Sequence, residues 1–226
     1  MARRAGSELS LDQVVEGARA LLRKHGFDAL SMRKLAAELG VTHAAVYYYV
    51  ANKDVLVDLV VESLYAQVQP PTTGTWQERL RSVLASVRAV FAEYPGALPY
   101  LFSRTGTSPS GLRVLEEAMT WLLDAGFDER RVAETALMAA ILIIGQGQLE
   151  ATRAAPGSVS PDAPLVADLD LAQLPSIVRL APLFAKPVGQ PEFDRAIELL
   201  ISNLEQSRSP DNPLPATTRA ASRPTR

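Results

Sequence analysis

The chain has 226 residues, 47% of them hydrophobic and 21% charged, with a formal net charge of −2 and no cysteine. This composition suits a globular protein with a sizeable core, and it excludes disulfides, zinc–thiolate sites and cysteine nucleophiles. The charged first residues lack a signal-peptide pattern, and the longest apolar run, 136–144, is shorter than the roughly 20 residues that span a bilayer, so we expect a cytoplasmic protein without a membrane partner.

Four helical patterns follow one another before the proline pair at 70–71 interrupts the chain. The first opens with Ser10 and Gln13, which have the spacing of a capping box. The other three open with residues suited to helix N-caps, namely Ser31, Thr42 and Asn52. No alternating strand pattern of useful length occurs in the sequence, so the predicted fold class is all-α.

Longer amphipathic helices are predicted beyond the prolines. They cover residues 76–93, 97–103, 110–125, 129–152 and 191–206, with shorter helical pieces at 168–174 and 176–185. Seven of the 16 prolines lie between residues 154 and 191, which favours loops in that region. The last residues, 207–226, have almost nothing to bury and are expected to be disordered.

The second and third patterns have the spacing of a helix-turn-helix. Ala36 supplies the small residue of the first helix, Gly40 the turn glycine, and Val46 an apolar residue inside the second helix. Residues 1–53 carry eight basic and five acidic side chains, a charge of +3, whereas the remaining chain carries −5. A basic head suggests a nucleic-acid partner; the alternative is an ordinary helical hairpin.

The same segment resembles the tetracycline-repressor (TetR) family of bacterial transcriptional regulators. The resemblance lies in the stretches KHGFDALSMRKLAAELGV, THAAVYYYV and NKDVLVDLV, and the late segment PEFDRAIELLISNLE is similar to the last helix of the tetracycline-repressor subgroup. It implies an all-helical homodimer with a DNA-binding head and a ligand-binding body. The predicted domains are therefore a helix-turn-helix domain at 1–53, a ligand-binding and dimerisation domain at 54–206, and a disordered tail at 207–226.

Three consecutive tyrosines lie in the expected recognition helix. Val46 and Val50 should point into the head, which turns Tyr47 toward DNA and leaves Tyr48 and Tyr49 on the flanks. Phenols that contact phosphates position a protein on DNA without reading its bases. All three tyrosines are predicted DNA contacts, and Tyr48 is the one most expected to have a structural part as well.

Further DNA contacts are predicted around these tyrosines. Lys53 begins the fourth helix, where free N–H groups favour an anion, so we expect it to clamp a phosphate. By resemblance, Arg33 matches a family position that reads guanine, and the capping Thr42 together with His43 and Ala44 completes the set. The glutamine and proline of the tetracycline repressor are absent at the matching places, so its operator sequence cannot be transferred to this chain.

The family's ligand cavity would lie among apolar residues of the later helices, although plain core is the alternative for each of them. The candidates are Trp76, Leu80, Leu84, Val87, Phe91, Tyr100, Leu101, Phe102, Trp121, Leu122, Met138 and Leu142. Gln146 is expected to orient an apolar or aromatic ligand. Because both histidines lie in the head, a histidine-held metal–tetracycline complex in the body is not expected, and no cofactor or metal site is predicted.

Dimerisation is expected through the helices at 129–152 and 191–206, which form a four-helix bundle in the family. The apolar run 137–144 fits this use, and so does a set on the second helix: Phe193, Ile197, Leu200, Ile201 and Leu204. The alternative is that these residues belong to a core within one chain.

The expected function is that of a dimeric repressor that binds a palindromic DNA operator and is released by a small molecule. Control by a protein partner, and activation in place of repression, are the alternatives. An enzyme is disfavoured because the body has neither histidine nor cysteine and no recognisable catalytic spacing.

Overall fold

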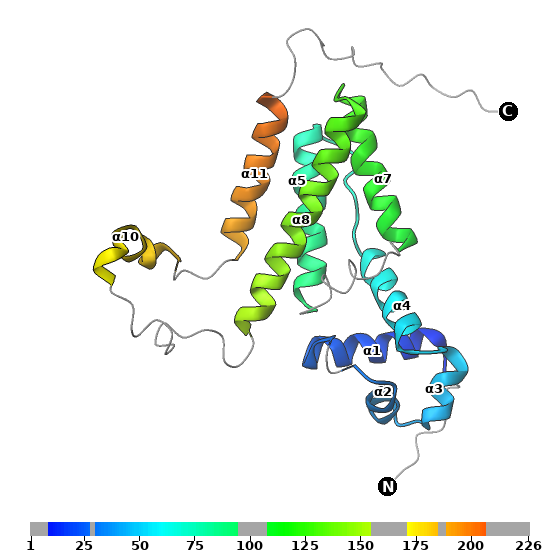
Figure 1. The fold of residues 1–226 in the computed structure, drawn as a ribbon. Coiled ribbons are helices and arrows are strands. Elements are labelled where there is room, and N and C mark those ends of the chain that lie inside the picture. Colours follow the sequence, from blue (N-terminus) through cyan, green and yellow to red (C-terminus); the bar gives the residue numbers. More distant parts are fainter. Residues whose placement is uncertain (1–8, 28–29, 95–107, 155–170, 185–188, 207–226) are drawn as a thin grey trace, which may run out of the picture.

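The protein was analysed as a computed structural model that describes residues 9–27, 30–94, 108–154, 171–184 and 189–206 (Figure 1). Every regular element in these ranges is a helix, which confirms the predicted all-α class. The expected helix at 97–103 and the expected disordered tail lie outside the described residues.

Four helices form the N-terminal part of the fold: α1 (Leu11–His25), α2 (Met32–Leu39), α3 (His43–Tyr49) and α4 (Lys53–Tyr65). All four predicted N-caps are confirmed, because each capping side chain accepts the backbone N–H three residues later. Ser10 and Gln13 make the full capping box. We call α1, α2 and α3 the head; α2 packs on both α1 and α3 around fully buried Leu35 and Val46.

The turn between α2 and α3 depends on backbone conformation. Gly40 has a φ of 66°, in the left-handed region, and the Val41 N–H donates to the Ala36 carbonyl at 3.0 Å to close the helix end. A Cβ at Gly40 would meet nothing within 4 Å. Glycine is therefore favoured by the backbone angle and not by lack of space.

Longer helices form the body: α5 (Trp76–Ala92), α7 (Pro109–Asp124), α8 (Glu129–Ala154) and α11 (Gln190–Gln206). Helices α5, α7 and α8 pack against one another, and α11 packs on α8 and α5. A short 3₁₀ turn, η2 (Leu171–Gln173), precedes α10 (Pro175–Phe184). The predicted helices at 76–93, 110–125, 129–152, 176–185 and 191–206 agree with these bounds to within one or two residues, whereas the structure describes only the 3₁₀ turn Leu171–Gln173 of the predicted piece at 168–174.

Helix α4 connects the two parts. It packs against α1 of the head at one end and against α5 and α7 of the body at the other (Figure 1). Its buried residues belong to the same continuous core as those of the head and the body. A displacement of α4 would therefore be felt in both regions.

Candidate nucleic-acid interface and ligand cavity

Helix α3 presents tyrosines on the outside of the head. Val46 and Val50 are buried as predicted, whereas the side chains of Tyr47 and Tyr48 are 44% and 83% exposed. Thr42 caps the helix through its hydroxyl, which accepts the Ala45 N–H at 3.2 Å. The short helix is held by its cap and two buried valines, which leaves Tyr47 and Tyr48 exposed on its surface.

Tyr49 differs from its neighbours because it is bound to the head. Its ring is half-buried against the core, and its hydroxyl donates a hydrogen bond to the Leu9 carbonyl. The structural part expected of Tyr48 therefore falls to Tyr49, while Tyr48 only meets the Tyr49 ring edge-on at 5.1 Å. Leu9 lies 40 residues away in sequence, so no local pattern could have identified this bond.

The other predicted DNA contacts lie on the surface of the same region. Arg33 on α2 and both His43 and Ala44 on α3 are exposed. The His43 ring packs edge-on against Tyr47, with centroids 4.8 Å apart. Lys53 is the first residue of α4, as predicted, and is half-buried. Contact of these residues with DNA stays a prediction, but their exposure is compatible with it.

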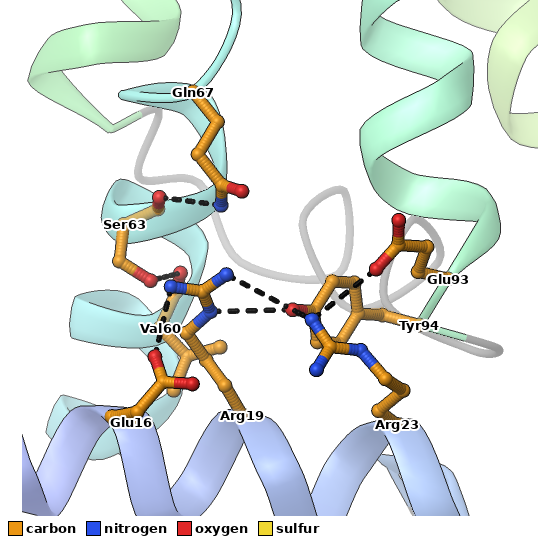
Figure 2. Close-up of polar contacts among 8 residues, drawn as sticks. All are labelled: Glu16, Arg19, Arg23, Val60, Ser63, Gln67, Glu93 and Tyr94. Carbon is orange, nitrogen blue, oxygen red and sulfur yellow. Dashed lines mark hydrogen bonds and ion pairs between the residues drawn. The ribbon is translucent and has the colours of Figure 1, made fainter.

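The head also touches the body through a cluster around Tyr94, which follows α5 (Figure 2). The buried Tyr94 hydroxyl accepts hydrogen bonds from Arg19 Nε at 3.2 Å and Arg23 Nη2 at 2.6 Å, both from α1. Arg23 also pairs with Glu93 at 3.2 Å, and Arg19 with Glu16 at 3.0 Å. Two cations of the head are therefore fixed on one phenol of the body.

A second polar contact joins α4 to α7. The Glu62 carboxylate accepts the Ser110 backbone N–H at 3.0 Å and the Ser110 hydroxyl at 2.5 Å, at the N-terminus of α7. Burial alone would raise the pKa of Glu62, but the hydrogen bonds from Ser110 outweigh it and the pKa is lowered. The carboxylate is thus held ionised at a helix N-terminus, where the dipole favours negative charge.

A cavity of about 350 Å³ lies among α4, α5, α7 and α8. Its lining is almost wholly apolar and consists of Tyr65, Leu80, Val83, Leu84, Val87, Gly111, Val114, Leu115, Ala118, Met119, Leu122, Thr135, Ala136, Leu137, Ala139, Ala140 and Ile143. Of the residues predicted to line a pocket, four do so: Leu80, Leu84, Val87 and Leu122. Tyr100, Leu101 and Phe102 lie outside the described residues.

The remaining pocket candidates do not line this cavity. Trp76 packs edge-on against Phe127 at 5.0 Å, Phe91 contacts Tyr65, and Trp121 lies near the Arg79 guanidinium. Leu142 is half-buried against the core, and Met138 is exposed. A helical stripe shows which residues face inward, but it does not show which of them meet a neighbour and which meet an empty space.

Gln146, which was expected to orient a ligand, is buried, hydrogen-bonded within the chain and absent from the lining of this cavity. Its side chain donates to the Glu150 carboxylate at 3.0 Å and to the Gly189 carbonyl at 2.8 Å. Glu150 also pairs with Arg88 of α5 at 2.6 Å, and Arg88 donates to Gln190 at 2.5 Å. This mostly buried cluster joins α5, α8 and the start of α11.

The predicted dimer residues divide into two groups. Four of the five on α11 are buried in the chain's own core, which corrects their assignment to an interface: Phe193, Ile197, Ile201 and Leu204. Helix α8 instead exposes an apolar stripe of Leu137, Met138, Ile141 and Leu149, of which Leu137 also borders the cavity, and Leu199 of α11 is 67% exposed. We call the four α8 residues the outer face.

The outer face belongs to a helix of unusual composition. Residues 129–150 of α8 are long and apolar enough to cross a membrane by length and composition alone, and 22% of an 18-residue stretch of this segment is buried. An apolar helix of a water-soluble assembly passes the same test. Across the described ranges, no three His, Cys, Asp or Glu side chains gather in a way that could hold a metal ion.

Comparison with known families places both parts of the chain. The family model described as "Bacterial regulatory proteins, tetR family" matches residues 14–60, and the model described as "Tetracyclin repressor-like, C-terminal domain" matches residues 69–207. Together these matches extend from the first helix to the last described one.

Individual relatives and solved structures agree with these matches. The chain is 29% identical to the HTH-type transcriptional repressor DrrR1 of Streptomyces coeruleorubidus and 32% identical to the class E tetracycline repressor protein of Escherichia coli. The matched regions cover 61% and 54% of this chain but only 52% and 59% of those two relatives. The crystal structure of Streptomyces coelicolor ActR in complex with actinorhodin superposes with a TM-score of 0.73, at 27% identity, covering 88% of this chain and 98% of that one.

Proposed function

Because this chain belongs to the TetR family of bacterial transcriptional regulators, we propose that it is a dimeric repressor that binds a palindromic operator and is released by a small molecule. The observation that carries the DNA-binding part is the exposed surface of α3. There His43, Ala44 and Tyr47 face outward from a capped helix whose valines are buried. Such a helix, preceded by a glycine turn, is the element that enters a major groove.

Each predicted contact has its own part in this binding. Arg33 reads a guanine through O6 and N7, while Lys53 and the exposed hydroxyls of Tyr47 and Tyr48 bind backbone phosphates and set the position of the head. Lys53 lies at the N-terminus of α4, where the backbone N–H groups favour the same phosphate. The tyrosines add contact area without a base preference, so specificity depends on Arg33, His43 and Ala44.

The outer face is the proposed dimer interface. A stripe of exposed aliphatic side chains on a long helix is better covered by an identical stripe than by water. Gly145 lies beside this stripe, and a Cβ there would meet nothing within 4 Å, so a second helix has room to approach. We therefore assign this apolar surface to a second copy of the chain and not to a membrane.

The cavity is the proposed effector site. It is open and apolar, which favours a small molecule over a protein partner as the controlling ligand. The likeness to ActR, whose solved structure holds actinorhodin, supports the same choice. Helix α4 has Tyr65 at the cavity and Lys53 at the predicted DNA surface, so a ligand that displaces α4 changes the spacing of the two heads.

The test is selection of bound duplexes from a random DNA pool by the full-length protein at near-physiological salt, followed by sequencing. A palindromic consensus with half-sites about one helical turn, or 34–36 Å, apart is the expected result. Absence of enrichment with folded, dimeric protein would contradict DNA recognition by this head. An enriched sequence without two-fold symmetry would contradict the dimer but would support DNA recognition by the head.

A further inference from the structure

The cavity contains one polar side chain whose surroundings indicate a ligand contact. Tyr65 is the last residue of α4 and lines the cavity. Its ring packs edge-on against Phe91 of α5, with centroids 5.0 Å apart. On the α7 side, a Cβ added at Gly111 would lie only 3.1 Å from two Tyr65 ring carbons. The ring is therefore wedged between α5 and the backbone of α7.

The Tyr65 hydroxyl has no hydrogen-bond partner among the described residues. Within these residues, the buried side-chain nitrogen and oxygen atoms that lack both a partner and solvent contact are Arg79 Nε and Arg88 Nε. The Tyr65 oxygen is not one of them, so it is not fully enclosed by neighbouring atoms, and its residue lines the cavity. Burial raises the pKa of this phenol, which keeps it neutral and able to donate its proton.

The other polar groups named in the described lining, Thr135 and the Gly111 N–H, are already hydrogen-bonded within the protein. Thr135 donates its hydroxyl to the Arg131 carbonyl at 2.7 Å, and the Gly111 N–H donates to the Ser108 hydroxyl at 2.8 Å. No charged side chain occurs in the lining that the structure describes. A charged ligand would lose its hydration without gaining a partner in this part of the wall, which strongly disfavours it.

We propose that the cavity selects an uncharged, mostly apolar ring compound that carries a carbonyl oxygen, and that the Tyr65 hydroxyl donates a hydrogen bond to this oxygen. This inference rests on the proposed effector site and specifies its ligand class. A cavity of about 350 Å³ is at the lower end of the usual range for small-molecule sites, which suits a compact fused-ring ligand.

The position of Tyr65, which we call the anchor of the ligand, has a second consequence. Tyr65 and Lys53 are the two ends of the same helix, so a ligand held by Tyr65 acts directly on the element that begins at the predicted phosphate clamp. A ligand that fills the apolar wall without bonding Tyr65 would lack this direct hold on α4. The hydroxyl thus contributes to both selection of the ligand and its coupling to DNA.

The experiment compares three probes of one ring shape by equilibrium dialysis against the full-length protein. They are 9-fluorenone, which has the carbonyl; fluorene, which lacks it; and 9-oxofluorene-2-carboxylate, which adds a charge. The protein is the natural chain and its Tyr65→Phe variant, which removes the hydroxyl and keeps the ring. Tyr48→Phe is the matched control, because it makes the same change at an exposed tyrosine outside the cavity.

We expect the natural chain to bind fluorenone about five- to tenfold more tightly than fluorene, the typical net effect of one hydrogen bond, and to bind the carboxylate least. Tyr65→Phe should remove the preference for fluorenone and leave the affinity for fluorene unchanged, and Tyr48→Phe should change neither. A variant with a narrower cavity, Ala118→Leu, should weaken both uncharged probes equally, which locates them in the cavity.

Equal binding of fluorenone and fluorene, equal loss of both in Tyr65→Phe, or tighter binding of the carboxylate would each overturn the proposal. If the uncharged probes bind and respond to Ala118→Leu but not to Tyr65→Phe, the cavity is still supported as the effector site, and the proposed hydrogen bond from Tyr65 is wrong. If no probe binds, both the anchor and its ligand class are wrong. The random-pool selection then decides separately whether the head still reads an operator.

Discussion

The head and the body of this chain expose surfaces of different chemistry. The head presents hydroxyls and cations around α3, with Tyr47, Tyr48 and Arg33 all exposed. The body presents aliphatic side chains, both on its outer face and around its cavity. Binding by the head should therefore release counterions and weaken with salt, whereas binding by the body should depend on apolar area and tolerate salt.

This contrast shows how an exposed surface can indicate its partner. A phenol hydroxyl or a guanidinium is well hydrated in the protein without DNA, so its exposure to water costs little free energy. An exposed leucine or isoleucine gains about 25 cal/mol for each Å² that a partner covers. The salt dependence of binding therefore distinguishes the head from the body. Each variant below changes the head, the body or a contact between them.

The largest effect is expected from a charge placed in the outer face. Ile141 is 53% exposed at the middle of this face, so Ile141→Glu should leave the monomer folded and separate the dimer at both low and high salt. Loss of the second head removes two-site binding, and operator affinity should fall at least about 100-fold. Sedimentation velocity and a DNA titration measure the two changes.

A matched control for this variant is Leu112→Glu. Leu112 is a similarly exposed leucine on α7, outside the outer face and the cavity lining. It should remain dimeric and bind the operator as the natural chain does. A dimeric Ile141→Glu protein would contradict the outer face as the interface.

The next effect is on the head. Lys53→Ala should weaken binding to all DNA sequences by about tenfold and reduce the slope of log affinity against log salt by about one, because one phosphate contact is lost. Lys24→Ala removes a lysine from the exposed end of α1 and should change neither quantity. An unchanged salt slope in Lys53→Ala would mean that this lysine does not contact a phosphate.

Local features of the head could be predicted from sequence because they depend on neighbours in the chain. The caps at Ser31 and Thr42 and the left-handed turn at Gly40 each involve residues within a few positions. The bond from Tyr49 to Leu9 and the bonds from Arg19 to Tyr94 span 40 and 75 residues, and nothing in the local pattern indicates them. Tertiary packing decides these contacts.

The body was predicted less well for a physical reason. Leu84 and Trp76 lie on one apolar stripe of α5, yet Leu84 faces the cavity and Trp76 packs on Phe127. Periodicity identifies an inward face, but the empty space depends on how four helices fit together. Tyr65 was missed for the same reason. Its hydroxyl has no hydrogen-bond partner among the described residues, and only the packing of the helices shows this.

A smaller effect is expected at the contact between head and body. Tyr94→Phe removes the acceptor of the Arg19 and Arg23 N–H groups and should lower the free energy of unfolding by about 1–2 kcal/mol. Urea unfolding at neutral pH measures it, with Tyr48→Phe as the control for an exposed hydroxyl. Full stability in Tyr94→Phe would show that the cluster does not hold the head to the body.

The smallest effect is a pH dependence at the joint between α4 and α7. The folded state holds the pKa of Glu62 below the ordinary glutamate value of 4.5. Its stabilisation is therefore fully present above pH 4.5 and disappears as the pH falls through the lowered value. Because Glu62 is partly exposed, Glu62→Gln should reduce stability at pH 7 by at most about 1 kcal/mol.

The difference between the natural chain and Glu62→Gln should shrink as urea unfolding is repeated at pH values that fall from 4.5 through the lowered pKa of Glu62, below which both chains carry an uncharged side chain. Glu117→Gln, an exposed change on α7, should show no such convergence. A stability difference that stays constant with pH would mean that the contact between Glu62 and Ser110 depends on packing and not on the negative charge of the carboxylate. The contact between α4 and α7 would then depend on packing, as the apolar body does, and not on charge, as the head does.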